Sequence, residues 1–129
     1  MKDLIAKIVY FKEKEKMITI YHNSRCKKSR EGLEIVENSG KEFQVREYLK
    51  EELSEEELKT LLTKLNMTAI QLVRKNEKIW KENFKDKDLS ENELVRIMVE
   101  NPKLIERPIV ENETKAVVGR PPEDIKNVV

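Results

Sequence analysis

The feature that most limits the fold of this chain is an extended apolar run followed at once by a helical pattern. The run "MITIYH" begins at Met17 and contains β-branched residues, which is typical of a buried strand. Apolar residues at helical spacing then predict a helix over residues 27–38, with Gly40 ending it. A second strand is expected in "FQVREYL", residues 43–49. A strand, a helix and a strand in this order favour helices packed against a sheet.

The rest of the chain continues this alternation. A serine or threonine followed three residues later by Glu or Gln predicts a helix start, because side chains and backbone N–H groups cap each other. This pattern occurs at Ser54 with Glu57, at Thr68 with Gln71 and at Ser90 with Glu93. The segment "RPIVENETKAVVGR" predicts a β-hairpin with "ENET" as its turn, and "PPEDIKNVV" predicts a last helix. We therefore expect an α/β fold with a small mixed sheet flanked by helices.

Composition excludes several classes of function. The 129 residues suit one compact domain. Lys and Arg number 26 against 25 Asp and Glu, so no global basic field attracts nucleic acid. The chain has one cysteine, which excludes an internal disulfide, and neither a secretory pattern nor a membrane-spanning stretch is visible. We expect a cytoplasmic monomer with no bound cofactor, no metal site, and neither nucleic acid nor membrane as a partner.

The only cysteine and the only histidine lie together in "HNSRCKKSR", residues 22–30, which holds four basic residues and no acid. Cys26 falls at the expected boundary between strand and helix, where free backbone N–H groups and the helix dipole favour an anion. With the flanking basic side chains, this position predicts a lowered thiol pKa and a nucleophilic thiolate. The alternative is a buried cysteine without chemistry, against which the charged neighbours count. His22 is either a contributor to this site or a structural residue.

Three arginines differ from the other basic residues in their surroundings. Arg74 in "LVRKN", Arg107 in "ERPIV" and Arg120 in "GRPPE" adjoin apolar or proline-containing segments. A guanidinium presents its donors in a planar fork that binds tetrahedral oxyanions. Three of them beside one thiolate would form a site for an anionic substrate. Alternatively, each pairs with one of the 25 acidic residues.

The segments "ITIYHNSRCKKSREGLEIVENSG", "LVRKN", "NPKLIERPIV" and "GRPPE" together resemble the glutaredoxin-dependent arsenate reductase family, which shares its fold with the Spx-type regulators. The resemblance implies a thioredoxin-like, or glutaredoxin-like, fold with an inserted helical segment. It runs from Met17 to the C-terminus, so residues 17–129 are expected to form one arsenate reductase-type domain. Residues 1–16 are set apart as an N-terminal extension, and the sequence leaves open whether Met17 is the natural start.

The resemblance also implies roles for individual residues. The family's catalytic cysteine matches Cys26, and the histidine held to lower its pKa matches His22. A serine three residues after the cysteine matches Ser29. The three oxyanion-binding arginines and a cis-proline match the following residues: Arg74, Arg107, Arg120 and Pro108.

The implied activity is reduction of arsenate to arsenite, a step in arsenic detoxification, through a thiolate–arsenate adduct. Because the chain has no second cysteine, the resolving thiol must come from outside; in the family it is glutathione, as co-substrate, followed by glutaredoxin. Lys27 and Lys28 stand where well-characterised members carry small residues, so another oxyanion or a glutathionylated protein thiol is an alternative substrate. A second alternative is an Spx-like regulator that binds RNA polymerase. Ser29, in place of the second cysteine of a Cys-x-x-Cys pair, counts against redox sensing by such a regulator.

Overall fold

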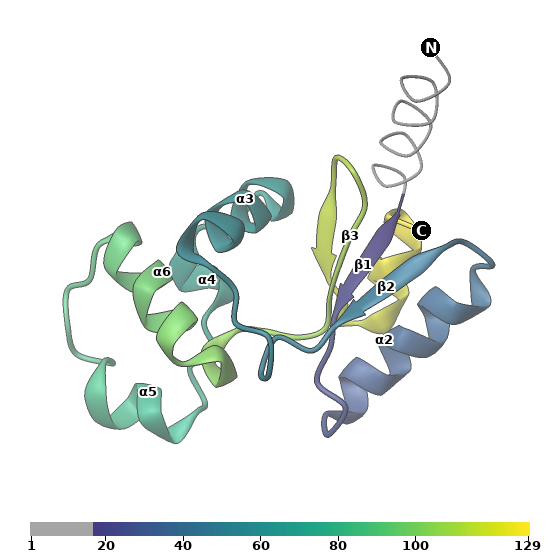
Figure 1. Cartoon of the computed structure of the whole chain (residues 1–129). Coiled ribbons are helices and arrows are strands. Elements are labelled where there is room, and N and C mark those ends of the chain that lie inside the picture. Colours follow the sequence, from purple (N-terminus) through teal and green to yellow (C-terminus); the bar gives the residue numbers. More distant parts are fainter. Residues whose placement is uncertain (1–16) are drawn as a thin grey trace, which may run out of the picture.

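A computed structural model describes residues 17–129, and the proposed extension, residues 1–16, lies outside the described residues. The described part is a small sheet with helices on both sides (Figure 1). Helix α2 and the final 3₁₀ helix η2 pack against each other on one side, and helices α3 to α6 gather on the other. This agrees with the expected mixed sheet flanked by helices and carrying an inserted helical segment.

The sheet has four strands in the order β2-β1-β3-β4. Strands β1 and β2 are parallel, with Tyr21 opposite Arg46, whereas β3 runs antiparallel to both β1 and β4. Their bounds are β1 Ile18–Tyr21, β2 Phe43–Arg46, β3 Ile109–Glu111 and β4 Ala116–Val118. The expected hairpin is therefore confirmed, but its turn is residues 112–115 rather than "ENET", residues 111–114, because Glu111 still pairs with Ala116. Because β1, β2 and β4 end at the same edge while β3 begins there, four chain segments meet at that edge.

Alternating side chains of the strands enter two separate cores. Ile18 and Ile20 of β1 pack with Val110 toward α2 and η2. Tyr21 and Ile109, which are opposite each other in the register, face the helical insert. This alternation follows from the two-residue period of a strand, and it explains why a short sheet with apolar residues on both faces needs helices on both sides.

The insert lies between β2 and β3, and three of its helices, α3, α4 and α6, begin where the sequence predicted. Ser54 and Glu57 form a complete capping box, in which each side chain accepts a hydrogen bond from the other residue's backbone N–H. Ser90 Oγ accepts from the Glu93 N–H at 3.2 Å, and the Gln71 side chain accepts from the Thr68 N–H at 2.9 Å. The insert comprises α3 Glu55–Leu65, α4 Ala69–Leu72, α5 Lys78–Asn83, α6 Glu91–Glu100 and the 3₁₀ helix η1 Pro102–Leu104.

Two expected elements differ from the structure. Strand β2 ends at Arg46 rather than Leu49, because residues 48–50 form a turn in which the Lys50 and Glu51 N–H groups both bond the Glu47 carbonyl. The last helix, η2 Pro122–Asn127, is a 3₁₀ helix and not an α-helix. Helix α2, Lys27–Asn38, matches its expected bounds.

Two glycines allow the loop before β3 to lie close against α2. A Cβ at Gly32 in α2 would come within 2.7 Å of Pro108 Cγ and 2.9 Å of Ile125 Cδ1. A Cβ at Gly119 would meet the same two side chains at 3.0 and 2.8 Å, and the Gly119 N–H donates to the Pro108 carbonyl at 2.8 Å. The Arg107–Pro108 bond is cis, which is the isomer expected from the resemblance, and Arg120–Pro121 is also cis. Close packing of these residues sets the position of the backbone that carries Arg107.

Candidate active site

Cys26 is the N-cap residue of α2 and has an extended backbone conformation, with φ −96° and ψ 123°. Its carbonyl accepts the first helical hydrogen bond, from Arg30, at 3.0 Å. The thiol therefore lies at the positive end of the helix, as the sequence predicted, and it is half-buried. It is also at the edge of the sheet where β1 and β2 end and β3 begins.

The loop before Cys26 is held by one buried hydroxyl. Ser29 Oγ accepts from the Asn23 N–H at 2.9 Å and contacts His22 Nδ1 at 2.7 Å. Burial is the main influence on His22 and lowers its pKa from the ordinary value of 6.5, so the ring is neutral at pH 7. In the structure His22 thus adds no positive charge at neutral pH, and its side chain contacts Ser29, which orders the loop around the sulfur.

Two of the three predicted arginines lie beside the sulfur. Arg120 Nη2 is 3.6 Å from Cys26 Sγ, and Arg120 Nε donates to the Arg107 carbonyl at 2.7 Å. The same Nε is 3.6 Å from a carboxylate oxygen of Glu106. These contacts tie the segment after β4 to the segment before β3, so both arginines are held beside the thiol.

The thiol pKa reflects a balance of opposing effects. Burial is the largest and raises it, but the Ser29 backbone N–H and the Arg107 guanidinium outweigh burial and hold the pKa of Cys26 below its ordinary value. The Lys28 backbone N–H adds to this. The sequence-based reason was partly wrong: the flanking basic side chains point to solvent, since Arg25, Lys27, Lys28 and Arg30 are all exposed. The main positive charge at the sulfur comes from a residue 81 positions away (107 − 26 = 81).

Arg74 reaches the same region from the helical insert. Its backbone N–H donates to the Leu104 carbonyl at 2.7 Å, next to a bridge between Val73 and Ile105. This pairing places Arg74 alongside the chain that leads into Arg107. The charges of Arg74, Arg107 and Cys26 all act on the Tyr48 phenol, which is 1% exposed. Tyr48 is therefore the residue that links Arg74 to the site, and the sequence analysis missed it because its segment looked like a strand.

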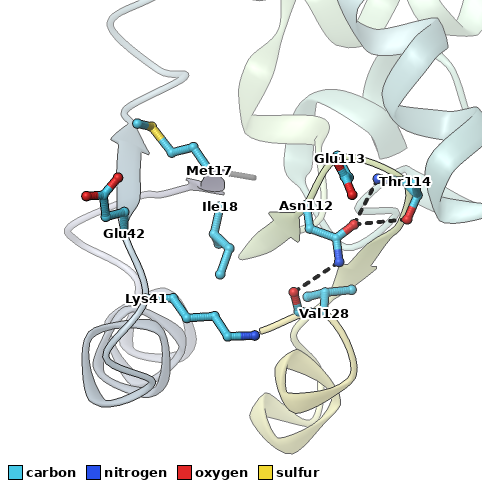
Figure 2. Close-up of a pocket in the computed structure, with 8 residues that line it drawn as sticks. All are labelled: Met17, Ile18, Lys41, Glu42, Asn112, Glu113, Thr114 and Val128. Atoms are coloured by element: carbon cyan, nitrogen blue, oxygen red, sulfur yellow. Dashed lines mark hydrogen bonds between the residues drawn. The ribbon is translucent and has the colours of Figure 1, made fainter. Parts of the chain in front are cut away.

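One hollow in the described part of the chain involves none of these residues. A hollow of about 600 Å³ lies where β1 begins, at the opposite end of the sheet from Cys26 (Figure 2). Asn112 closes one side by donating to the Val128 carbonyl at 3.1 Å. Within residues 17–129 no cluster of three or more His, Cys, Asp or Glu side chains is placed to hold a metal, and no helix is long and apolar enough to cross a membrane.

Comparison with known proteins identifies the family. Residues 21–128 match the model of the ArsC family, and this range includes Cys26, helix α2 and all three arginines. The chain belongs to the ArsC family. An arsenate reductase of Haemophilus influenzae is 40% identical over 87% of this chain and 98% of its own length. The "Uncharacterized protein YfgD" of Escherichia coli K12 is 46% identical over 88% of this chain and 98% of its own length.

A solved structure supports the same conclusion. The arsenate reductase of Vibrio cholerae superposes with a TM-score of 0.83 at 43% identity, covering 88% of this chain and 98% of its own. The ArsC-family fold is thioredoxin-like, so the fold class expected from the sequence is confirmed. Relatives named arsenate reductase support an oxidoreductase.

Proposed function

We propose that this chain reduces arsenate to arsenite through a covalent adduct on Cys26, with glutathione and glutaredoxin as external reductants. The observation that carries the proposal is the environment of the sulfur: Arg120 Nη2 lies 3.6 Å away, and Arg107 lowers the thiol pKa. A thiolate beside two guanidinium groups suits attack on a tetrahedral oxyanion, because the same positive charge stabilises the nucleophile and binds the substrate. Family members named arsenate reductase supply the choice of arsenate.

In the first step the Cys26 thiolate forms a sulfur–arsenic bond and one arsenic–oxygen bond breaks. The departing oxygen takes up protons and leaves as water. Arginine donors at Arg107 and Arg120 would hold the remaining oxygens and balance their charge. Arsenic is still As(V) in this adduct.

The second step needs a thiol from outside, because Cys26 is the chain's only cysteine. Glutathione thiolate attacks the Cys26 sulfur, a disulfide forms, and the electron pair of the sulfur–arsenic bond goes to arsenic, which leaves as arsenite. The two electrons thus come from two thiols. A glutaredoxin thiolate then takes the glutathione from Cys26 and restores the free thiol. Since both reductants are cytoplasmic thiols, we place this reaction in the cytoplasm, carried out by a monomer.

The test is a coupled assay of arsenate-dependent NADPH oxidation with glutathione, glutaredoxin and glutathione reductase. Wild type is compared with Cys26→Ser and Arg107→Ala, and with Arg25→Ala as a matched control from the exposed flank. We expect turnover that Cys26→Ser abolishes, that Arg107→Ala strongly lowers, and that Arg25→Ala leaves close to wild type. Absence of arsenate-dependent turnover in folded wild-type protein would refute the proposal.

A further inference from the structure

Four buried polar atoms at the edge of the sheet that carries Cys26 have no hydrogen-bond partner within residues 17–129. One is Arg46 Nε, whose guanidinium already bonds Glu57 and the Glu52 carbonyl through its other nitrogens. The other three are Tyr48 Oη, Arg74 Nη1 and Arg107 Nε. Arg74 Nη1 approaches Glu77 Oε1 at 3.3 Å, but without hydrogen-bond geometry. A buried donor without a partner costs stability, and native proteins rarely retain one without a reason. Three donors gathered at one edge indicate that a ligand completes their hydrogen bonds.

The register of the strands explains why these atoms come together. Tyr48 lies two residues after the end of β2, next in the sheet to the end of β1 from which the chain runs on to Cys26. Arg107 lies two residues before β3, which begins beside Tyr21 at the same edge. The Val73–Ile105 bridge brings Arg74 alongside this last segment. Four residues that are distant in sequence therefore meet at one place.

The Tyr48 hydroxyl has the properties of a ligand donor. Burial raises the pKa of Tyr48 to about 12, against the opposing charges of Arg107 and Arg74, so the phenol keeps its proton at neutral pH. Its ring belongs to the apolar core on the insert side, where a phenylalanine would fill the same volume without burying a hydroxyl. Packing alone thus gives no reason for the oxygen. The Arg107 guanidinium lies close to this oxygen but without hydrogen-bond geometry, and the hydroxyl proton of Tyr48 has no acceptor among the described residues.

We propose that Tyr48 donates a hydrogen bond to an oxygen of the oxyanion held between Cys26 and the three arginines, Arg74, Arg107 and Arg120, and so is a further ligand of the substrate. This proposal rests on the proposed oxyanion chemistry. A tetrahedral anion offers more acceptor positions than the guanidinium groups alone fill, and a neutral donor adds a hydrogen bond without adding charge. The unpartnered nitrogens of Arg74 and Arg107 would bond other oxygens of the same anion.

Tyr21 offers a matched control. It is also buried, at 7% exposed, and it packs in the same core as Tyr48. Its hydroxyl, however, donates to a carboxylate oxygen of Glu111, so its hydrogen bond is already made within the protein. Replacing either tyrosine by phenylalanine removes one hydroxyl from one core, but only Tyr48→Phe removes the proposed ligand.

The experiment measures how well phosphate, and separately arsenate, protects Cys26 from alkylation in wild type, Tyr48→Phe and Tyr21→Phe. Thermal unfolding is followed with and without anion. We expect Tyr48→Phe to weaken the anion's apparent affinity by about 10-fold or more, as for loss of a hydrogen bond to a charged group. Without anion its melting temperature is unchanged or higher, because a buried unpartnered hydroxyl is gone. Tyr21→Phe is expected to melt lower and bind anion as wild type does.

Each outcome decides a different question. If Tyr48→Phe binds both anions as tightly as wild type, the role of Tyr48 is refuted while the oxyanion site stands. If neither anion protects Cys26 in wild type, the oxyanion site itself is refuted, and the role of Tyr48 with it. If protection is normal but the coupled assay shows no turnover, the arsenate assignment fails while the anion ligands, Tyr48 included, are retained.

Discussion

Replacing Gly32 by alanine would place a methyl group against the loop that carries Arg107. The new Cβ would lie 2.7 Å from Pro108 Cγ and 2.9 Å from Ile125 Cδ1, both closer than carbon atoms pack. Such overpacking costs roughly 1–3 kcal/mol. Alanine in place of glycine within a helix gives back about 1 kcal/mol. The net expectation is a loss of about 1 kcal/mol, or a fall in melting temperature of roughly 4 °C for a domain of this size.

Variants at a second position in the helix measure the effect of helix propensity separately from that of the close contact at residue 32. Glu34 lies in the same helix and is exposed, so the difference between Glu34→Gly and Glu34→Ala measures the gain from glycine to alanine without overpacking. Thermal unfolding of all three variants gives the comparison. The alkylation rate of Cys26 is measured in parallel, because a displaced Pro108 shifts Arg107 and slows the reaction. Gly32→Ala protein that melts higher by the gain seen at residue 34, with unchanged thiol reactivity, would refute this reasoning.

Two further predictions concern titration. Arg107→Gln removes a charge that lowers the Cys26 pKa, so the midpoint of the pH profile for Cys26 alkylation is expected to move to higher pH. Arg25→Gln, a change at an exposed residue, is expected to leave the midpoint nearly unchanged. Equal midpoints for wild type and Arg107→Gln would contradict this. The His22 pKa is lower in the folded chain than its ordinary 6.5, so the unfolded state binds that proton more tightly and the free energy of unfolding falls as pH decreases through about 6.5. The free energy of unfolding, measured by urea denaturation from pH 5 to 8, is expected to depend less on pH in His22→Gln than in wild type. The same pH dependence in both proteins would count against a lowered His22 pKa in the folded chain.

Local sequence signals predicted the elements that depend on neighbouring residues. The Ser54 capping box and the start of α2 at Lys27 rest on side chains that bond within one helical turn, so a short window of sequence contains the whole cause. The placement of Cys26 at the N-cap followed from the same boundary.

Features set by distant residues could not be read in this way. The stretch after β2 has strand-like composition, but Tyr48 turns into the core because the insert supplies apolar partners from far along the chain. The charge at the thiol was expected from the adjacent Arg25 and Lys27, whereas it comes from Arg107 through the pairing of β1 with β3. The register of the sheet decides this contact, and spacing in the sequence does not encode it.

Two parts of the chain carry the candidate site, and the bridge between Val73 and Ile105 joins them. Arg74 belongs to the helical insert, and Arg107 belongs to the loop fixed on the sheet by Pro108. An anion bound to both arginines would join the two parts. Its binding free energy therefore adds to the free energy required for the insert to open locally. Substrate would then slow amide hydrogen exchange in α4 more than in β1, because only the opening of the insert separates the two arginines. In this arrangement the substrate is itself a cross-link of the folded state.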